Sequence, residues 1–122
     1  MKKLKFLWVT ASNLNGEIPD TIGEMEALVH LDLAINNLTG KIPSSLFMPK
    51  NLSIVFLYRN QLSGEIPRVV EALNVDFIDL SDNKLTGSIP DDFGRLRNMK
   101  DLSLFSISYL EKSQTILAVF QV

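Results

Sequence analysis

The stretch Leu38-Thr39-Gly40-Lys41-Ile42-Pro43 decides the fold, because close relatives of it recur along the 122-residue chain. The other copies lie at residues 14–19, 62–67 and 85–90. Their glycines stand at positions 16, 40, 64 and 87, so successive copies are 24, 24 and 23 residues apart. A multi-residue pattern at such a fixed spacing indicates a repeat architecture, in which each structural unit stacks on the next.

A second pattern precedes each copy and consists of regularly spaced aliphatic residues around one polar position. Its clearest form, L-x-x-L-x-L-x-x-N-x-L, is made by Leu28, Leu31, Leu33, Asn36 and Leu38. Pattern and period together are the signature of a leucine-rich repeat. The alternating leucines predict a short strand in each coil, and stacking of the coils places these strands in a parallel sheet.

Each recurring position has a physical role. Asn36, Asn60 and Asn83 are predicted to form a buried ladder, because an amide side chain can satisfy backbone donors and acceptors inside a turn. The glycines allow a turn that a side chain would obstruct, and the prolines stiffen the return path. The apolar residues three positions after each proline are predicted to fill the core from the convex side: Ile22, Leu46, Val70 and Phe93.

The predicted fold is a right-handed solenoid of the α/β type, with a short parallel β-sheet on its concave face. Its convex side is expected to be irregular or 3-10, with few or no regular α-helices. Residues 1–106 form the predicted array, and residues 107–122 form a non-repeat tail. We expect coils at about 4–27, 28–51, 52–74 and 75–98, with a partial coil at 99–106.

Composition and charge argue against several other classes of protein. The chain has no cysteine, which excludes disulfides, thiolate metal sites and a cysteine nucleophile, and its only histidine is His30. We therefore predict no metal and no cofactor. A net charge of −2 argues against a nucleic-acid partner. No apolar run approaches the roughly 20 residues of a membrane span, and Lys5 interrupts the apolar stretch near the N-terminus, which fits the repeat better than a signal peptide.

The extended pattern N-x-L-x-G-x-I-P-x-x-I-G-x-L, present at residues 13–25 and 83–96, resembles the plant-type repeat of receptor-like kinases and receptor-like proteins. The resemblance covers residues 4–106, and residues 56–60 and 104–106 are similar to the HAESA-like group of peptide-hormone receptor kinases. It implies an ectodomain fragment on the extracellular face of the plasma membrane, with a peptide or protein ligand and a co-receptor as partners. The cysteine-bearing caps, membrane span and kinase domain of that family are missing, so we expect an interior slice of a longer ectodomain.

Two motifs that suggest catalysis have simpler interpretations. Asp92-Phe93-Gly94 spells the magnesium-binding motif of kinases, but no catalytic loop accompanies it, and Phe93-Gly94 occupies the repeat position of Ile22-Gly23. His30 and Asp32 are expected on alternate exposed strand positions, where an acid–base pair would need a third group and a pocket. We interpret them as surface residues. No catalytic residue is predicted, and the chain is not expected to be an enzyme.

Asn37-Leu38-Thr39 and Asn51-Leu52-Ser53 are N-glycosylation sequons. Asn37 is expected at an exposed turn beside the asparagine ladder, where it could accept a glycan in a secreted protein. Asn51 precedes a leucine that is expected to be buried, which makes it the weaker candidate.

The side chains that alternate with the core leucines indicate a candidate binding surface. Six of the ten aromatic residues fall on these positions, where the core does not require them, and contiguous exposed aromatic surface often marks a binding site. The predicted ligand-binding residues are Trp8, Phe56, Tyr58, Arg59 and Phe77. The alternative interpretation is that aromatic residues simply favour strands and pair across them.

Two functions are therefore considered. The first is ligand recognition by a fragment of a plant receptor-like kinase ectodomain, in signalling or defence perception. The second is a secreted inhibitor resembling polygalacturonase-inhibiting proteins, which share this repeat. An inhibitor of cell-wall enzymes is expected to present a basic concave surface. The acidic side chains expected on this surface favour the receptor: Asp32, Asp79, Asp82 and Asp101.

Overall fold

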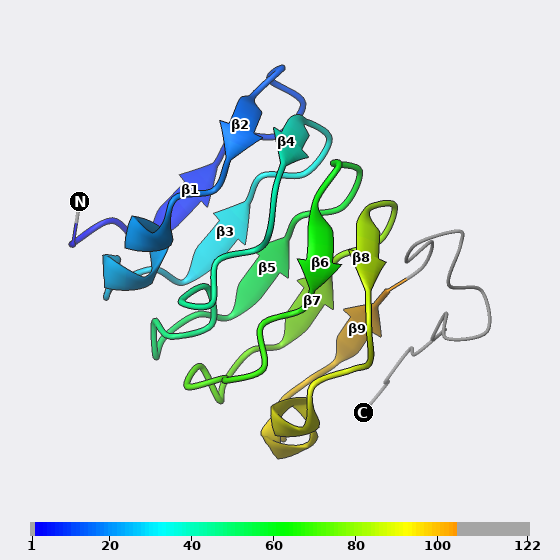
Figure 1. Cartoon of the computed structure of the whole chain (residues 1–122). Helices are drawn as coiled ribbons and strands as arrows, with labels where there is room; N and C mark the ends of the chain where they lie inside the picture. The colour runs from blue at the N-terminus through cyan, green and yellow to red at the C-terminus, as the bar shows by residue number, and fades with distance from the viewer. Residues whose placement is uncertain (1, 105–122) are drawn as a thin grey trace.

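The computed structural model describes residues 2–104 and shows a row of stacked coils, with the chain advancing by one coil at each repeat (Figure 1). One strand from each coil enters a five-stranded parallel sheet in the order β1-β3-β5-β7-β9. These strands are β1 (Phe6–Trp8), β3 (His30–Asp32), β5 (Ile54–Phe56), β7 (Phe77–Asp79) and β9 (Asp101–Ser103). The predicted solenoid is confirmed, with one short strand of each coil in a parallel sheet.

Two further pairs of parallel strands lie just after the asparagine-ladder positions of the coils. The sequence analysis did not predict them. They are β2 (Asn15–Glu17) with β4 (Asn37–Thr39), and β6 (Ser63–Glu65) with β8 (Lys84–Thr86). In Figure 1 they form a second, shorter row along one end of the main strands. Each ends close to the recurrent glycine, whose backbone is left-handed, as at Gly40 with φ +77°. This conformation turns the chain toward the convex side.

The convex side contains short 3-10 helices and turns, as predicted. Helices η1 (Asp20–Glu24) and η2 (Asp91–Arg95) each begin directly after a proline, Pro19 and Pro90, whose φ is already suited to the first turn. Within residues 2–104 there is no α-helix, and neither 3-10 helix has the length or the apolar character needed to cross a membrane.

The core lies between the sheet and the convex wall. In the middle of the strands, register pairing aligns one apolar column that begins at Leu7, and its next four members have at most 1% of their surface exposed: Leu31, Val55, Ile78 and Leu102. The residues predicted to fill the core from the convex side are all buried: Ile22, Leu46, Val70 and Phe93. Burial of a leucine-sized side chain contributes about 1.5–3 kcal/mol, so these columns supply most of the stability of the stack.

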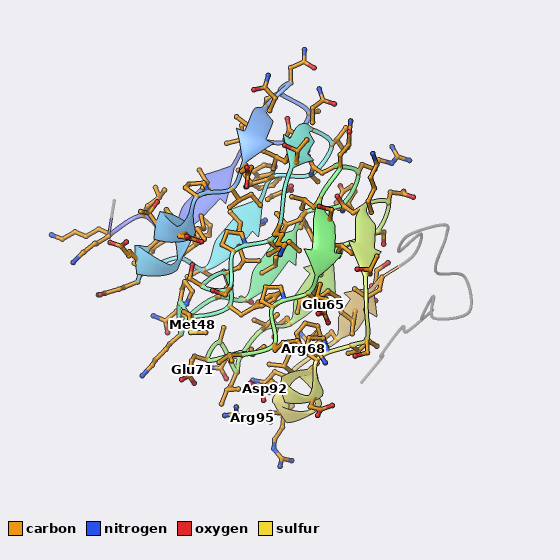
Figure 2. All side chains as sticks on the ribbon, in the orientation of Figure 1. Met48, Glu65, Arg68, Glu71, Asp92 and Arg95 are labelled. Carbon is orange, nitrogen blue, oxygen red and sulfur yellow. The ribbon has the colours of Figure 1, made fainter. Side chains whose placement is uncertain are left out.

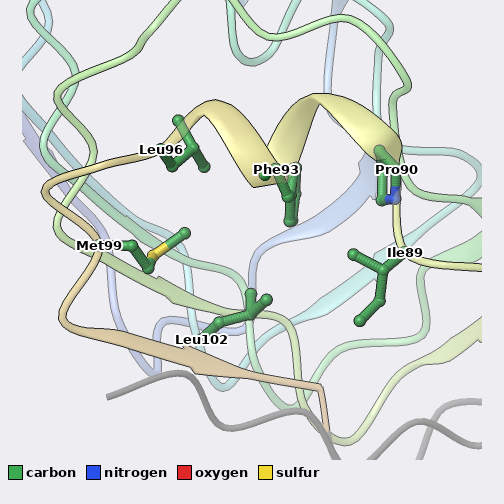
Figure 3. Close-up of a pocket in the computed structure, with 7 residues that line it drawn as sticks. Ile89, Pro90, Phe93, Leu96, Met99 and Leu102 are labelled. Carbon is green, nitrogen blue, oxygen red and sulfur yellow. The ribbon is translucent and has the colours of Figure 1, made fainter. Parts of the chain in front are cut away.

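Both ends of the described core are open. At the N-terminal end, a cavity of about 260 Å³ is lined by Leu7, Val9, Leu14 and neighbouring apolar residues. At the C-terminal end, Phe93 and Leu96 from η2 and its flank face Met99 and Leu102 across a cavity of about 250 Å³ (Figure 3). Inside the stack, apolar residues of the neighbouring coil fill the space that corresponds to these cavities.

The asparagine ladder joins each coil to the one before it. The Asn60 Nδ2 atom donates to the Leu33 carbonyl of the preceding coil at 3.0 Å and to the Leu57 carbonyl of its own coil at 3.1 Å. The Asn60 Oδ1 atom accepts the Leu38 N–H at 3.0 Å. Asn83 repeats this arrangement one coil further on. The amide groups thus satisfy backbone atoms that the turn leaves without a partner.

Asn36 makes more hydrogen bonds to the preceding coil than the other ladder residues do, because Ser12 occupies the ladder position of the first coil. The Asn36 Oδ1 atom accepts two backbone N–H groups, from Ser12 and Leu14, both at 2.9 Å. Its Nδ2 atom donates to the Val9 carbonyl at 2.7 Å. The Ser12 hydroxyl bonds only locally, to the Thr10 carbonyl. The turn of the first coil is therefore completed by the second.

The residue before each ladder position has a left-handed backbone. The φ angles lie between 51° and 57° at all four positions: Ala11, Ile35, Arg59 and Asp82. Residues other than glycine rarely adopt this conformation, and it is most unfavourable for a β-branched residue such as Ile35. The ladder hydrogen bonds hold the backbone there, because they require the chain to reverse direction just before the asparagine.

Polar contacts between coils complete the convex side, and they explain the sequence Asp92-Phe93-Gly94. The Asp92 Oδ2 atom accepts the Val70 N–H of the preceding coil at 3.0 Å and lies 3.5 Å from Arg95 Nη1 (Figure 2). Phe93 is buried in the core. Asp92 and Phe93 therefore have structural roles, as their repeat position indicated.

Candidate functional site

The outward-facing side chains of the five-stranded sheet form a continuous surface, which we call the sheet face. Because successive residues of a strand point to opposite sides, Leu7 enters the core while its neighbours Phe6 and Trp8 point outward. Their surfaces are 60% and 66% exposed. Parallel register places the outward residues in two rows across the coils. The first row is Phe6, His30, Ile54, Phe77 and Asp101, and the second is Trp8, Asp32, Phe56, Asp79 and Ser103.

Rings from three coils meet on the N-terminal part of the sheet face and form an aromatic cluster of Phe6, Trp8, His30, Phe56 and Tyr58. The indole of Trp8 stacks on the His30 imidazole, with ring centroids 5.0 Å apart and planes 26° apart. Phe6 and Phe56 contact the same imidazole edge-to-face, at 6.4 and 6.1 Å. Phe56 in turn meets Tyr58 at 5.9 Å. Such offset-stacked and edge-to-face pairs are the favoured geometries of aromatic rings.

His30 is the central member of this cluster, and the sequence analysis did not select it. The sequence alone indicates an ordinary surface residue, but the structure places His30 half-buried between three rings. Its Nε2 atom is shielded and has no hydrogen-bond partner among the described residues. The available signal was the register itself, which aligns His30 beside Phe6 in the row next to the one that holds Trp8 and Phe56.

The expectation that Asp32 is exposed is wrong. Only 5% of its surface is accessible, and its Oδ1 atom accepts the Ala34 N–H two residues later at 3.0 Å. Asp79 makes the same bond to the Ser81 N–H, also at 3.0 Å. This local turn is a common use of aspartate at the end of a strand. His30 and Asp32 therefore have separate roles, one in ring packing and one in the turn.

The five predicted ligand-binding residues do not all lie together. Trp8, Phe56 and Tyr58 belong to the aromatic cluster. Phe77 is half-buried and lies beside Ile54 in the register of β5 and β7. Arg59 is exposed at the C-terminal ends of the strands, where its Nε atom lies 3.8 Å from Asp82 Oδ2. An exposed pair of this kind contributes about 0–1 kcal/mol, so the guanidinium can exchange partners at little cost.

The remaining candidate positions are accessible. Asn37 is exposed, although it lies in β4 rather than in a turn, and Asn51 is exposed just before the buried Leu52. In residues 2–104, no three side chains of the metal-binding types come together. The site thus consists of an aromatic surface, bordered toward the last coils by the carboxylates of Asp79, Asp82 and Asp101.

Comparison with known proteins agrees with this geometry. The Leucine Rich Repeat family model matches residues 27–48 and 74–96. No curated protein matched the chain. Among solved structures, the plant peptide hormone receptor RGFR1 in complex with RGF2 is 38% identical, with a TM-score of 0.80, over 85% of this chain and 17% of that one. The Arabidopsis receptor kinase HAESA, in complex with the peptide hormone IDA and the co-receptor SERK1, is 37% identical, with a TM-score of 0.84, over 87% and 18%.

The same coil geometry also occurs in a different kind of protein. A plant ice-binding protein is 36% identical, with a TM-score of 0.80, over 87% of this chain and 34% of that one. The chain spans less than a fifth of the two receptor structures, at 17% and 18% of their lengths. Proteins with different functions therefore share this fold. The function of this chain must be argued from the side chains of its sheet face.

Proposed function

Because the chain is a leucine-rich-repeat solenoid of the type found in plant receptor kinases, we propose that it is a ligand-recognition segment that binds an extended peptide across its sheet face. The observation that carries this proposal is the aromatic cluster around His30. Phe6 and Trp8 expose most of their surface although the leucine columns already supply the core. Aromatic residues in contiguous exposed patches are the usual anchors of protein interfaces.

Trp8, Phe56, Tyr58, Arg59 and Phe77 line the proposed groove, and His30 holds the rings of the aromatic cluster in place. Neighbouring strands of a sheet lie roughly 4.8 Å apart, so five strands span about 19 Å, enough for about six residues of an extended peptide. The full length of the related receptors is several times greater, so this segment provides a partial site of weak affinity. Arg59 offers a forked donor for a carboxylate of the ligand, in exchange for Asp82.

The rest of the proposal follows from the resemblance to receptor ectodomains. The segment lies on the extracellular face of the plasma membrane, acts in signalling together with a co-receptor, and has no catalytic activity of its own. Exposure of Asn37 and Asn51 is compatible with glycosylation there. The carboxylates at the border of the sheet face favour this role over a secreted inhibitor of cell-wall enzymes. A full-length transcript distinguishes the two, because only the receptor carries a membrane span and a kinase frame downstream.

The direct test is peptide binding by the immobilised full chain on a biosensor surface. Phe56→Ala and Arg59→Ala are each expected to weaken binding by more than about 0.5 kcal/mol, the least that an anchor should contribute. Val69→Ala is the matched control, since Val69 is 54% exposed but lies outside the sheet face. If neither Phe56→Ala nor Arg59→Ala weakens binding more than this control, the aromatic residues serve only the sheet.

A further inference from the structure

The charge on the sheet face is unevenly distributed along the coils. The aromatic cluster occupies the first three coils, whereas Asp79 and Asp101 follow in the last two described coils, in the same two rows. Asp82 lies beside them and is paired with Arg59. Within residues 2–104, no lysine or arginine lies within ion-pair distance of Asp79 or Asp101. An apolar surface therefore leads into one of negative charge.

We propose that the ligand of this face is an extended peptide in which a bulky aromatic residue and a basic residue stand four positions apart. The proposal rests on the proposed function and adds the chemistry of the ligand. The aromatic residue covers Trp8 and Phe6, whose outer surfaces are exposed. The basic residue lies over Asp79 and Asp101, whose charge it complements.

The spacing of four follows from the register. Trp8, Asp32, Phe56 and Asp79 occupy one row, so Trp8 and Asp79 are three strand separations apart. At roughly 4.8 Å per separation this is about 14 Å, and an extended chain covers it in about four residues. Side chains four positions apart on an extended chain point to the same side, so both can face the sheet. Asp32 is buried and its Oδ1 atom accepts the Ala34 N–H, so Asp79 is the more accessible of the two carboxylates in this row.

Asp79 is available for this contact because its turn uses only part of the carboxylate. Its Oδ1 atom accepts the Ser81 N–H. The Oδ2 atom remains for a ligand cation, and the side chain is half-buried, which reduces screening relative to a fully exposed charge. Asp79→Asn keeps an oxygen for the Ser81 N–H while it removes the charge. This substitution therefore separates electrostatics from the structure of the turn.

The experiment compares short peptides with blocked termini, each containing one tyrosine and one variable position, on the immobilised full chain. At low salt, lysine four positions from tyrosine is expected to bind at least about fivefold tighter than glutamate there, and the difference should shrink in about 0.5 M salt. Asp79→Asn combined with Asp101→Asn should reduce the ratio to below twofold. Asp91→Asn is the control, since Asp91 is exposed on η2 and its loss changes the net charge by one unit without altering the sheet face.

Two results would overturn the inference while leaving the proposed function intact. One is equal binding of the lysine and glutamate peptides that still depends on Trp8 and Phe56. The other is equal binding when lysine stands three rather than four positions from tyrosine, because a side chain at that position points away from the sheet. Failure of every peptide in the series to bind would overturn the proposed function as well.

Discussion

Gly23 of η1 faces Ser45 of the next coil so closely that no methyl group fits between them. A Cβ atom on Gly23 would lie 2.7 Å from Ser45 Oγ and 2.8 Å from the Ser45 carbonyl oxygen. Gly94 occupies the same position in η2, yet no described atom lies within 4 Å of the corresponding point. The same residue of the repeat therefore permits close stacking on the next coil at Gly23, whereas at Gly94 it meets no described atom.

The pair provides a first prediction. Gly23→Ala is expected to lower the free energy of unfolding by about 1–3 kcal/mol, because Ser45 and its backbone must move to accommodate the methyl group. Gly94→Ala should change it by less than about 0.5 kcal/mol, or stabilise slightly by restricting the unfolded chain. Urea denaturation of both variants measures the difference. Equal effects would contradict the close packing of Gly23 against Ser45.

The ladder provides a second prediction. Asn60→Ala leaves the Leu38 N–H buried without its partner, while the Leu33 carbonyl keeps only its bond from Asn36, and the change is expected to cost about 1–3 kcal/mol. Asn98→Ala is the control, since Asn98 is exposed and bonds only to the side chain of Asn74. A denaturation midpoint for Asn60→Ala that matches the control would contradict a structural role for the ladder.

The strained backbone at Ile35 provides a third prediction. With φ at +57° and the side chain 38% exposed, Ile35→Asn is expected to stabilise the chain by about 0.5–1 kcal/mol, since asparagine tolerates the left-handed region. Ile35→Val retains the β-branch and should give no gain. Thermal unfolding of the two variants tests this, and a gain with valine would place the cause in hydrophobic exposure instead.

The open N-terminal end of the described core provides a fourth prediction. The apolar cavity there and the unpaired edge of β1 should cause the isolated chain to associate at tens of micromolar. Leu14→Lys at the N-terminal end is expected to reduce the associated fraction in light scattering. Val69→Lys makes the same kind of change away from both ends and should not. A clean monomer for the unmodified chain would refute the prediction.

Much of the fold was predictable because the same residue pattern recurs in each coil. The alternation around Leu31 and Leu33 indicated one short strand in each coil, and the proline before Ile22 or Phe93 indicated the convex turns. The pairs β2–β4 and β6–β8 were missed because the glycine segment has no alternation of apolar and polar residues. Their pairing follows from the stacking of equivalent segments in adjacent coils, which is a property of tertiary structure.

The candidate site was predictable only in outline. Alternation showed which side chains point outward, and that brought Trp8 and Phe56 onto the sheet face. It could not show that Asp32 turns back to its own backbone, although Asp32-Leu33-Ala34 and Asp79-Leu80-Ser81 share the spacing of this turn. It also left His30 among the surface residues, because the contacts of an imidazole with three rings depend on rotamers in three coils.

The direction of the asparagine ladder bears on how the chain emerges from the ribosome. Asn36 supplies partners to Ser12, Leu14 and Val9, all of which are synthesised more than twenty residues earlier. When the first coil leaves the exit tunnel, the backbone groups of its turn still lack these hydrogen bonds. They form only after the second coil has emerged. The second and third coils depend in the same way on Asn60 and Asn83, so order in this part of the solenoid trails synthesis by one repeat.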